Sequence, residues 1–340
     1  MKVLLFYLQD PGGANFLYPV LRKIKSELNH DFKIKVLCHP LSERIISDEY
    51  LEPNYNLKLK YPVSVEIWQQ FLRDNCVDKV VSTLSSNNFD KSNANLIIAA
   101  KNFNIKTLGF IDHWKGFGRL FNKKSEPEFC PNWLGVIDKY SINELRKINI
   151  KSVIHSVGHP VLEMPYKKQI QKKRFDRILI VSQPDIRTKN FDSLFFSKYK
   201  NSNLMEVLEI AIRNCLPGSE IYYRPHPKEN LKKLSNIAIR IDNSKKPVLF
   251  EKYDVFIGFD SMLLIEANLV GVESISIRFP EVLDIYKDKI PYRYASNVKT
   301  ISDFNNILNG KILSEKLNAN LFENSSNRCL NLIKSFCEAD

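Results

Sequence analysis

The chain has 340 residues, of which 44% are hydrophobic and 26% charged, a composition typical of one large or two medium globular domains. This composition excludes a collagen, a low-complexity chain and a disordered tail. The 50 lysines and arginines outnumber the 38 aspartates and glutamates, and the resulting formal charge of +12 favours anionic partners such as phosphate esters, nucleic acid or acidic lipid.

The six cysteines include no C-x-x-C pair, so they predict neither a zinc ribbon nor a dense disulfide scaffold. Their pattern indicates a reducing, cytoplasmic location. The first apolar run, Val3 to Leu8, breaks at Gln9-Asp10-Pro11, far short of the ~20 residues of a membrane span. It also lacks the longer apolar region and the cleavage site of a signal peptide, so we expect a buried strand.

Short apolar runs then alternate with helical patterns, which predicts parallel α/β sheets. The helical patterns repeat apolar residues at three and four positions, as one face of a helix requires. In the first half of the chain, strands are predicted at 2–8, 33–38, 79–82, 106–110, 133–137 and 153–157, and helices at 16–28, 64–75, 93–103 and 141–148.

The alternation stops after Val161, and the segment from Tyr166 to Arg177 carries six basic residues against one acidic residue. A second alternating set follows, with strands at 177–181, 220–224, 255–257 and 274–277, helices at 204–216 and 261–270, and a helical region at 301–336. The sequence therefore predicts two doubly wound α/β domains with a cleft between them. Their expected bounds are 1–163 and 178–312, with a basic linker at 164–177 and a helical segment, 313–340, that packs back on the first domain.

The segment from Gln9 to Asn15 is predicted to be a loop at the carboxyl end of the first strand. Gly12 and Gly13 let the backbone approach a ligand, and the following helix offers free N–H groups to an anion or polar acceptor. The spacing is not G-x-G-x-x-G, so it does not predict an NAD site. A tight strand-to-helix turn without a ligand is the alternative.

Asp112, His113, Trp114 and Lys115 follow the strand predicted at 106–110. At the carboxyl end of a parallel strand they concentrate possible base and phosphate-binding groups in one loop. The alternative is a structural Asp112 that caps the next turn, with His113 packed beside it.

A third motif, Arg224-Pro225-His226-Pro227, ends the strand at 220–224. Proline on both sides of His226 fixes the backbone and keeps the imidazole at the strand end. Arg224 and His226 together predict a phosphate clamp, since a guanidinium pairs bidentately with phosphate oxygens. A buried histidine in a turn is the alternative.

The fourth motif runs from Gly258 through Ser261 to Glu266. Gly258 ends a strand, and Ser261 is a favourable N-cap for a helix whose positive end points at a ligand. Glu266 lies in an otherwise apolar helix, where a buried carboxylate needs a partner. A pair of ribose hydroxyls is one such partner, and a salt bridge to an arginine is the alternative.

Two Rossmann-like halves, the R-P-H-P motif, and the strand-Gly-x-x-Ser-helix followed by A-N-L-V-G resemble the GT-B glycosyltransferases of bacterial capsule and lipopolysaccharide synthesis. The pattern is similar to the sialyltransferase-like, glycerophosphotransferase-like and nucleotide-sugar 2-epimerase branches. The opening QDPGGAN, the IDHW loop and Gly158-His159-Pro160 resemble a subset of the same superfamily.

The resemblance implies an acceptor domain at 1–163 and a nucleotide-sugar domain at 178–312. It implies Asp112 as catalytic base, with His113 and Asp10 as alternatives, and a phosphate contact from His226. The full set of implied nucleotide-sugar-binding residues is Gly12, Gly13, Arg224, His226, Gly258, Ser261 and Glu266.

We therefore expect a glycosyltransferase that moves a sugar from a nucleotide sugar, CMP- or UDP-linked, to a glycan or lipid-linked acceptor. The chain has no D-x-D motif, and basic groups can neutralise the leaving phosphate, so neither a metal nor another cofactor is expected. The paired glutamates of the 2-epimerases become Ile265-Glu266 here, which makes epimerisation the alternative. A non-catalytic nucleotide-binding scaffold is the third candidate.

The basic residues are dispersed, and no nucleic-acid module is present, so a nucleic-acid partner is not expected. The densest basic cluster, Lys167 to Arg177, is either a solvated connector or a patch that holds the protein near anionic lipid. The second interpretation predicts a cytoplasmic protein that is peripheral at the inner face of the membrane.

Overall fold

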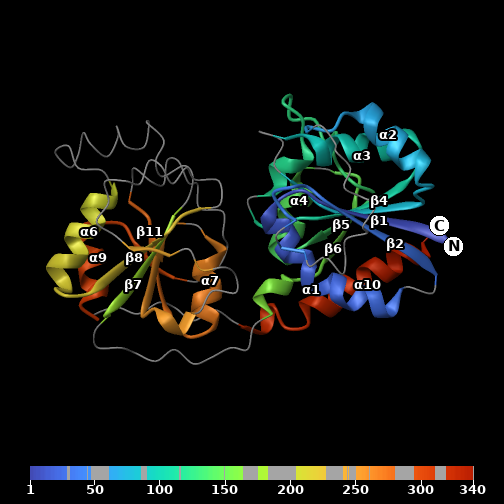
Figure 1. The fold of residues 1–340 in the computed structure, drawn as a ribbon. Coiled ribbons are helices and arrows are strands. Elements are labelled where there is room, and N and C mark those ends of the chain that lie inside the picture. The colour runs from blue at the N-terminus through green and yellow to red at the C-terminus, as the bar shows by residue number, and fades with distance from the viewer. Residues whose placement is uncertain are drawn as a thin grey trace. The chain divides into compact units, whose positions relative to one another are not determined.

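The computed structural model describes residues 1–28, 31–43, 45–46, 61–85, 90–114, 116–148, 150–163, 175–182, 204–226, 240–242, 244, 250–259, 261–279, 295–310 and 319–339. The chain forms two compact units (Figure 1). Unit 1 combines Met1–Glu163 with Asn320–Asp340, and unit 2 is Met164–Ala319. Most of the predicted linker, 164–174, lies outside the described residues.

Unit 1 is built on a parallel sheet whose strand order is β2-β1-β3-β4-β5-β6. The strands are β1 (Lys2–Leu8), β2 (Phe32–Cys38), β3 (Lys79–Thr83), β4 (Lys106–Phe110), β5 (Trp133–Val136) and β6 (Val153–Ser156). Strands that helices cover on both faces are continuous apolar runs in the sequence. For this reason the sequence predicts the central strands of this sheet. The chain winds in opposite directions from β1, so a topological switch point lies between β1 and β3.

Helices cover both faces of this sheet (Figure 1). One apolar cluster joins the sheet to α1 (Pro11–Glu27) and α10 (Ser325–Glu338). A second joins it to α2 (Val65–Asp74) and α3 (Ser92–Asn102). The other helical pieces in the described part of this unit are α4 (Lys139–Lys147), η2 (Gly116–Leu120) and η3 (Pro160–Leu162), and η7 (Ala319–Leu321) precedes α10.

The C-terminal helix α10 is fixed to unit 1 by polar contacts at both of its ends. At its start, the Ser325 hydroxyl accepts a hydrogen bond from the His159 N–H at 3.0 Å. Gly158 has a φ of +79°, and a Cβ atom there would lie 2.1 Å from Ser325 Oγ, so glycine is required. At its end, the buried Lys79 donates to the carbonyls of Phe336 and Cys337 at 2.8 and 3.0 Å.

Unit 2 has a parallel sheet with the order β12-β11-β10-β7-β8-β9. Its strands are β7 (Arg177–Val181), β8 (Glu220–Arg224), β9 (Arg240–Ile241), β10 (Val255–Gly258), β11 (Glu273–Ile277) and β12 (Ser296–Val298). In chain order this is the Rossmann arrangement, with its switch point between β7 and β10. The helices among its described residues are α6 (Leu204–Cys215), α7 (Met262–Leu269), α9 (Ile301–Leu308) and η6 (Phe250–Lys252).

The faces of the unit 2 sheet differ in which helices they bind. Alternate residues of β11, Ile275 and Ile277, enter the apolar cluster with α6 and α9. Ser274 lies on the opposite face and donates to the Leu264 carbonyl of α7 at 3.0 Å. The helix α7 therefore covers the second face of the sheet.

The structure corrects the prediction that Gln9 to Asn15 is a loop, because α1 already begins at Pro11. Proline is well suited to the first helical position, where its missing N–H has no helical partner to lose. Gly12 and Gly13 therefore lie in the first turn of a helix. The short strands β9 and β12 were not predicted, and two or three residues carry too little pattern to reveal a strand.

Candidate functional site

The carboxyl edge of the unit 1 sheet brings together several of the predicted site residues. Asp10 is the N-cap of α1, directly after β1, and Asp112 follows β4. A Cβ atom on Gly12 would lie 2.9 Å from Asp112 Oδ2, so the carboxylate lies against the first turn of α1. Ligands of doubly wound sheets bind at this edge, next to the switch point.

Asp112 is 8% exposed, and its carboxylate forms an ion pair with Arg119. Arg119 also donates to the Leu84 carbonyl at 2.6 Å, which fixes the guanidinium at the end of β3. Burial alone would raise the pKa of Asp112, but Arg119, with His113 and His159 nearby, holds the pKa below its usual range. The site therefore contains a fixed, ionised carboxylate.

The backbone around Asp112 is held by His159, one of the residues that the G-H-P motif had singled out. Its Nε2 lies 3.1 Å from the Asp112 carbonyl oxygen. The imidazole is 5% exposed and packs edge-on against Phe16 of α1 at 4.9 Å between ring centroids. His159 thus links the Asp112 loop to α1.

The neighbours of Asp112 in the I-D-H-W loop have different environments. His113 is half-buried, and its carbonyl accepts from the Gly116 N–H at 2.8 Å. Trp114 is 1% exposed and donates from Nε1 to Asp138 Oδ2 at 2.8 Å. Asp138 is in turn the N-cap of α4, so Trp114 anchors the loop to the next helix, and Lys115 lies outside the described residues.

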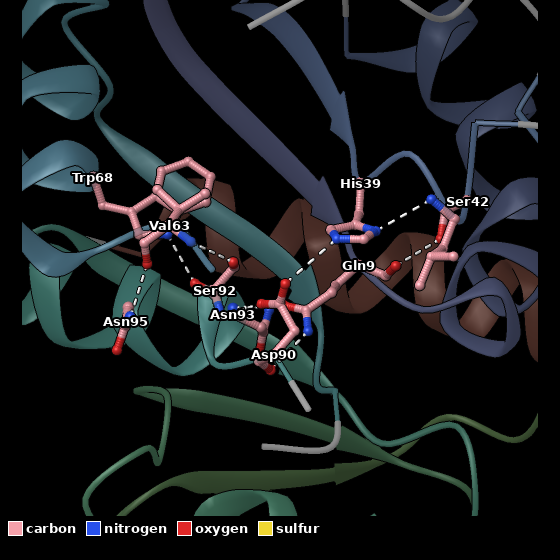
Figure 2. A network of polar contacts seen from close by, with 10 residues as sticks. Gln9, His39, Ser42, Val63, Trp68, Asp90, Ser92, Asn93 and Asn95 are labelled. Atoms are coloured by element: carbon pink, nitrogen blue, oxygen red, sulfur yellow. Dashed lines mark hydrogen bonds and ion pairs between the residues drawn. The ribbon is translucent and has the colours of Figure 1, made fainter. Parts of the chain in front are cut away.

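Gln9, the last residue before the α1 N-cap, is bound on three sides in a buried polar network (Figure 2). Its side chain accepts from the Asn93 N–H at 2.7 Å and donates to the Asp90 carbonyl at 3.0 Å. Its carbonyl accepts from the Ser42 hydroxyl at 2.8 Å. The start of α1 is thereby fixed to the segments that follow β2 and precede α3.

The same network contains a histidine and aspartate pair, His39 and Asp90 (Figure 2). His39 Nδ1 accepts from the Leu41 N–H at 3.1 Å, so the ring proton lies on Nε2, which is 3.4 Å from Asp90 Oδ2. Both nitrogens of His39 are used within the protein, which is typical of a structural histidine.

In unit 2, Gly258 and Ser261 lie beside the switch point between β7 and β10. A Cβ atom on Gly258 would lie 3.2 Å from the Val181 carbonyl oxygen, a close approach between neighbouring strand ends. Ser261 is the N-cap of α7, and its hydroxyl accepts from the Leu263 N–H at 3.3 Å. Glu266 is 6% exposed on the same helix.

Arg224 is the last residue of β8, the strand next to β7, and His226 lies two residues further along the chain. Arg224 donates to Asp242 Oδ2 at 2.7 Å and to the Ser244 hydroxyl at 3.0 Å. Burial opposes the ionised form of Asp242, but Ser244 and Arg224 lower its pKa below the usual value. Arg224 therefore already has a carboxylate partner, while His226 is half-buried.

Sequence reasoning missed three residues that shape these sites: Arg119, Asp90 and Asp242. None lies in a recognisable motif. Arg119 is in η2, and only the fold brings it back to Asp112. Asp242 is one residue beyond β9, a strand that was itself not predicted.

Within the described part of the chain, no group of three or more His, Cys, Asp or Glu residues is arranged to hold a metal ion. All six cysteines are free thiols. None of the described helices has the length and apolar character needed to cross a membrane.

Two Rossmann-like parallel sheets with helices on their faces define a GT-B fold, which confirms the predicted fold class. No family model and no curated protein sequence matches the chain. Solved structures do match over nearly its whole length. At sequence identities of 9% to 15%, the likeness establishes the fold alone.

One similar structure is the UDP-GlcNAc 2-epimerase of Methanocaldococcus jannaschii in complex with UDP-GlcNAc and UDP, with 15% identity and a TM-score of 0.64 over 98% of this chain and 100% of that one. Another is MurG of Acinetobacter baumannii, with 13% identity and a TM-score of 0.55 over 98% and 100%. A third is a glycotransferase of kitacinnamycin, with 9% identity and a TM-score of 0.55 over 98% of each chain.

Proposed function

We propose that this protein is a glycosyltransferase that moves a sugar from a nucleotide sugar to a glycan or lipid-linked acceptor. The observation that carries the proposal is the buried, ionised Asp112 carboxylate at the carboxyl edge of the unit 1 sheet, against the first turn of α1. The GT-B fold is compatible with it, because the similar structures include a glycotransferase as well as UDP-GlcNAc 2-epimerases.

In this proposal Asp112 binds the attacking hydroxyl of the acceptor. As the catalytic base, Asp112 would take the proton of this hydroxyl while the hydroxyl oxygen bonds to the anomeric carbon and the bond from that carbon to the leaving phosphate breaks. The lowered pKa of Asp112 keeps its carboxylate ionised before the reaction. His113, the next residue, is the alternative proton acceptor, and Asp10 at the N-cap of α1 is the second. The carboxylate orients the acceptor oxygen and stabilises the positive charge that develops at the anomeric carbon.

Unit 2 supplies the proposed donor site. The N-terminus of α7, at Ser261, would offer positive charge to the departing phosphate. Arg224, which keeps Asp242 as a partner, and His226 would donate hydrogen bonds to it. Glu266 would accept hydrogen bonds from the ribose hydroxyls, and Gly258 keeps the strand end free of side chain. These groups neutralise the leaving phosphate without a metal ion in the proposed scheme.

A non-hydrolysing 2-epimerase is the second candidate, favoured by the presence of several UDP-GlcNAc 2-epimerases among the similar structures, with TM-scores from 0.56 to 0.64. Against it, α7 carries Ile265 before Glu266 where the epimerases that the sequence resembles carry paired glutamates. A nucleotide-binding scaffold without activity is the third candidate. An epimerase converts the sugar with no acceptor, and a scaffold binds without turnover.

The test begins with thermal-shift screening against CMP-, UDP-, GDP- and CDP-linked sugars, because a ligand selective for the folded state raises the melting temperature. The selected donor is then incubated with and without a glycan acceptor panel, and products are followed by NMR. Transfer that is lost in Asp112→Asn with donor binding retained, and a weaker donor affinity in His226→Ala, would support the proposal. Conversion of the donor sugar without acceptor would contradict it.

The setting of this reaction is also a proposal. Surface-polysaccharide synthesis would place the enzyme in the cytoplasm, at the inner face of the membrane where lipid-linked acceptors reside. The basic segment 164–177 would provide the attraction to anionic lipid. Salt-sensitive cosedimentation with phosphatidylglycerol vesicles, absent with phosphatidylcholine vesicles, tests this part separately.

A further inference from the structure

Thr83, the last residue of β3, carries a fully buried hydroxyl that has no hydrogen-bond partner among the described residues. A buried hydroxyl without a partner costs free energy, because in water it would be hydrogen-bonded. A Cβ atom on Gly13 would lie 2.3 Å from Thr83 Oγ1, so this hydroxyl faces the first turn of α1. The buried Ser85 Oγ and Asn93 Nδ2 atoms nearby in the chain likewise find no partner in the part of the protein that the structure describes.

The first turn of α1 has donors to offer at the same place. This helix is 17 residues long, and its N-cap Asp10 makes no side-chain capping hydrogen bond. Pro11 has no N–H, so the first donors are the N–H groups of Gly12 and Gly13, which the helix itself does not use. Gly12 is exposed, so a ligand can approach the start of the helix.

The chemistry of the neighbours decides which ligand fits. The helix offers donors, whereas the ionised Asp112 Oδ2, which would be 2.9 Å from a Cβ on Gly12, only accepts. A phosphate oxygen accepts from the helix but is repelled by that carboxylate. A sugar hydroxyl both accepts and donates, so it satisfies the two sides together.

We propose that Thr83, the first turn of α1 and Asp112 form a subsite in unit 1 that binds hydroxyl groups of a sugar ring. One ring hydroxyl would accept from the Gly12 and Gly13 N–H groups and donate to Asp112. Because the first turn of α1 covers the Thr83 hydroxyl in the free protein, binding would include a small shift of this turn that gives the hydroxyl its partner on the sugar. The inference rests on the proposed function and assigns Thr83 to substrate recognition. The sugar is that of the nucleotide sugar or that of the acceptor.

The test compares Thr83→Val with Thr83→Ser and with a matched control, Thr107→Val. Thr107 is also fully buried, in the neighbouring strand β4, but its hydroxyl is hydrogen-bonded to Asn132 at 3.1 Å. Each variant is titrated by calorimetry with UDP-GlcNAc, or the nucleotide sugar selected in the screen, and with the parent nucleotide. A second titration uses the methyl glycoside of GlcNAc in saturating nucleotide, and the melting temperature of each free protein is measured.

We expect Thr83→Val to melt no lower than the wild type, because it removes an unsatisfied polar group, while Thr107→Val melts lower. Thr83→Val should bind the nucleotide sugar about three- to tenfold more weakly, the loss of one neutral hydrogen bond, with nucleotide affinity unchanged. Thr83→Ser should restore binding. Weakening confined to the glycoside titration would support the subsite and assign it to the acceptor.

Three results would overturn the subsite. In the first, Thr83→Val lowers the melting temperature as Thr107→Val does, which marks a structural hydroxyl. In the second, the nucleotide sugar, the nucleotide and the glycoside bind the variant as they bind the wild type. In the third, the wild type binds no nucleotide sugar, which removes the proposed function and the subsite with it, whereas the first two leave the proposed function standing.

Discussion

The Asp112 carboxylate is buried, and its charge is stable there because Arg119 is paired with it. Arg119→Met leaves the carboxylate without its cation, and breaking such a pair costs about 3 kcal/mol. We expect this loss in the free energy of unfolding of unit 1, measured with urea at pH 7. The double variant Arg119→Met/Asp112→Asn should recover much of the loss, since no buried charge remains. Equal stability of the double and single variants would contradict the pairing.

The pH dependence of Arg119→Met follows from the same pair. In the wild type the pKa of Asp112 is lowered, so the pair stabilises the fold above the pKa of the unfolded aspartate, and this contribution disappears as the pH falls through the folded pKa. Without Arg119, burial raises the pKa, and the charged form is destabilising. The stability difference between variant and wild type should therefore be largest near neutral pH and shrink through the ordinary aspartate range, about 4.

The substitution Gly13→Ala tests how closely α1 approaches the end of β3. In an ordinary helix, glycine to alanine gains up to about 1 kcal/mol. Here the new Cβ would lie 2.3 Å from Thr83 Oγ1 and 2.6 Å from Thr83 Cβ, so Gly13→Ala should instead lose about 1–2 kcal/mol. Gly118→Ala is the matched control, because nothing lies within 4 Å of its added Cβ. Urea unfolding of both variants measures the difference, and equal effects would be evidence against the close approach.

The helix α10 is held at its C-terminal end by hydrogen bonds from Lys79. Lys79→Met leaves the Phe336 and Cys337 carbonyls unpaired in a buried setting, and we expect a loss of about 2–3 kcal/mol. Lys106→Met is the control, because Lys106 is the register partner of Lys79 in β4 but is exposed. The buried thiols Cys329 and Cys337 on α10 should react faster with a thiol reagent in Lys79→Met only. Unchanged labelling would show that Lys79 does not hold the helix.

The elements that the sequence predicts well are those whose buried apolar residues recur at a regular spacing along the chain. Strands such as β4 and β7 were recognisable because parallel strands covered on both faces are continuous apolar runs. The start of α1 was placed too late because Gly12 and Gly13 are poor helix formers, and their reason for being there is close packing against Asp112 and Thr83. That reason exists only in the folded chain.

For the site, the sequence predicted which loops carry chemistry, since loops at the carboxyl ends of parallel strands face the ligand edge of a sheet. It did not reveal which partners those residues have. Arg119 pairs with the Asp112 carboxylate, His159 binds the Asp112 backbone, and Asp242 binds Arg224, yet tertiary contacts bring all three together with their partners. Local patterns contain no record of such pairings.

For the molecule as a whole, each unit has its own apolar core, so calorimetry should resolve two unfolding transitions. Lys79→Met identifies the transition of unit 1, because its contacts lie there. A nucleotide that binds the α7 and β8 residues should stabilise unit 2 by about 2.7 kcal/mol at a concentration of 100 times its Kd, and so raise the temperature of the other transition. A nucleotide that shifts only the Lys79-sensitive transition would relocate the phosphate site to unit 1 and remove the roles proposed for Arg224, His226 and Ser261.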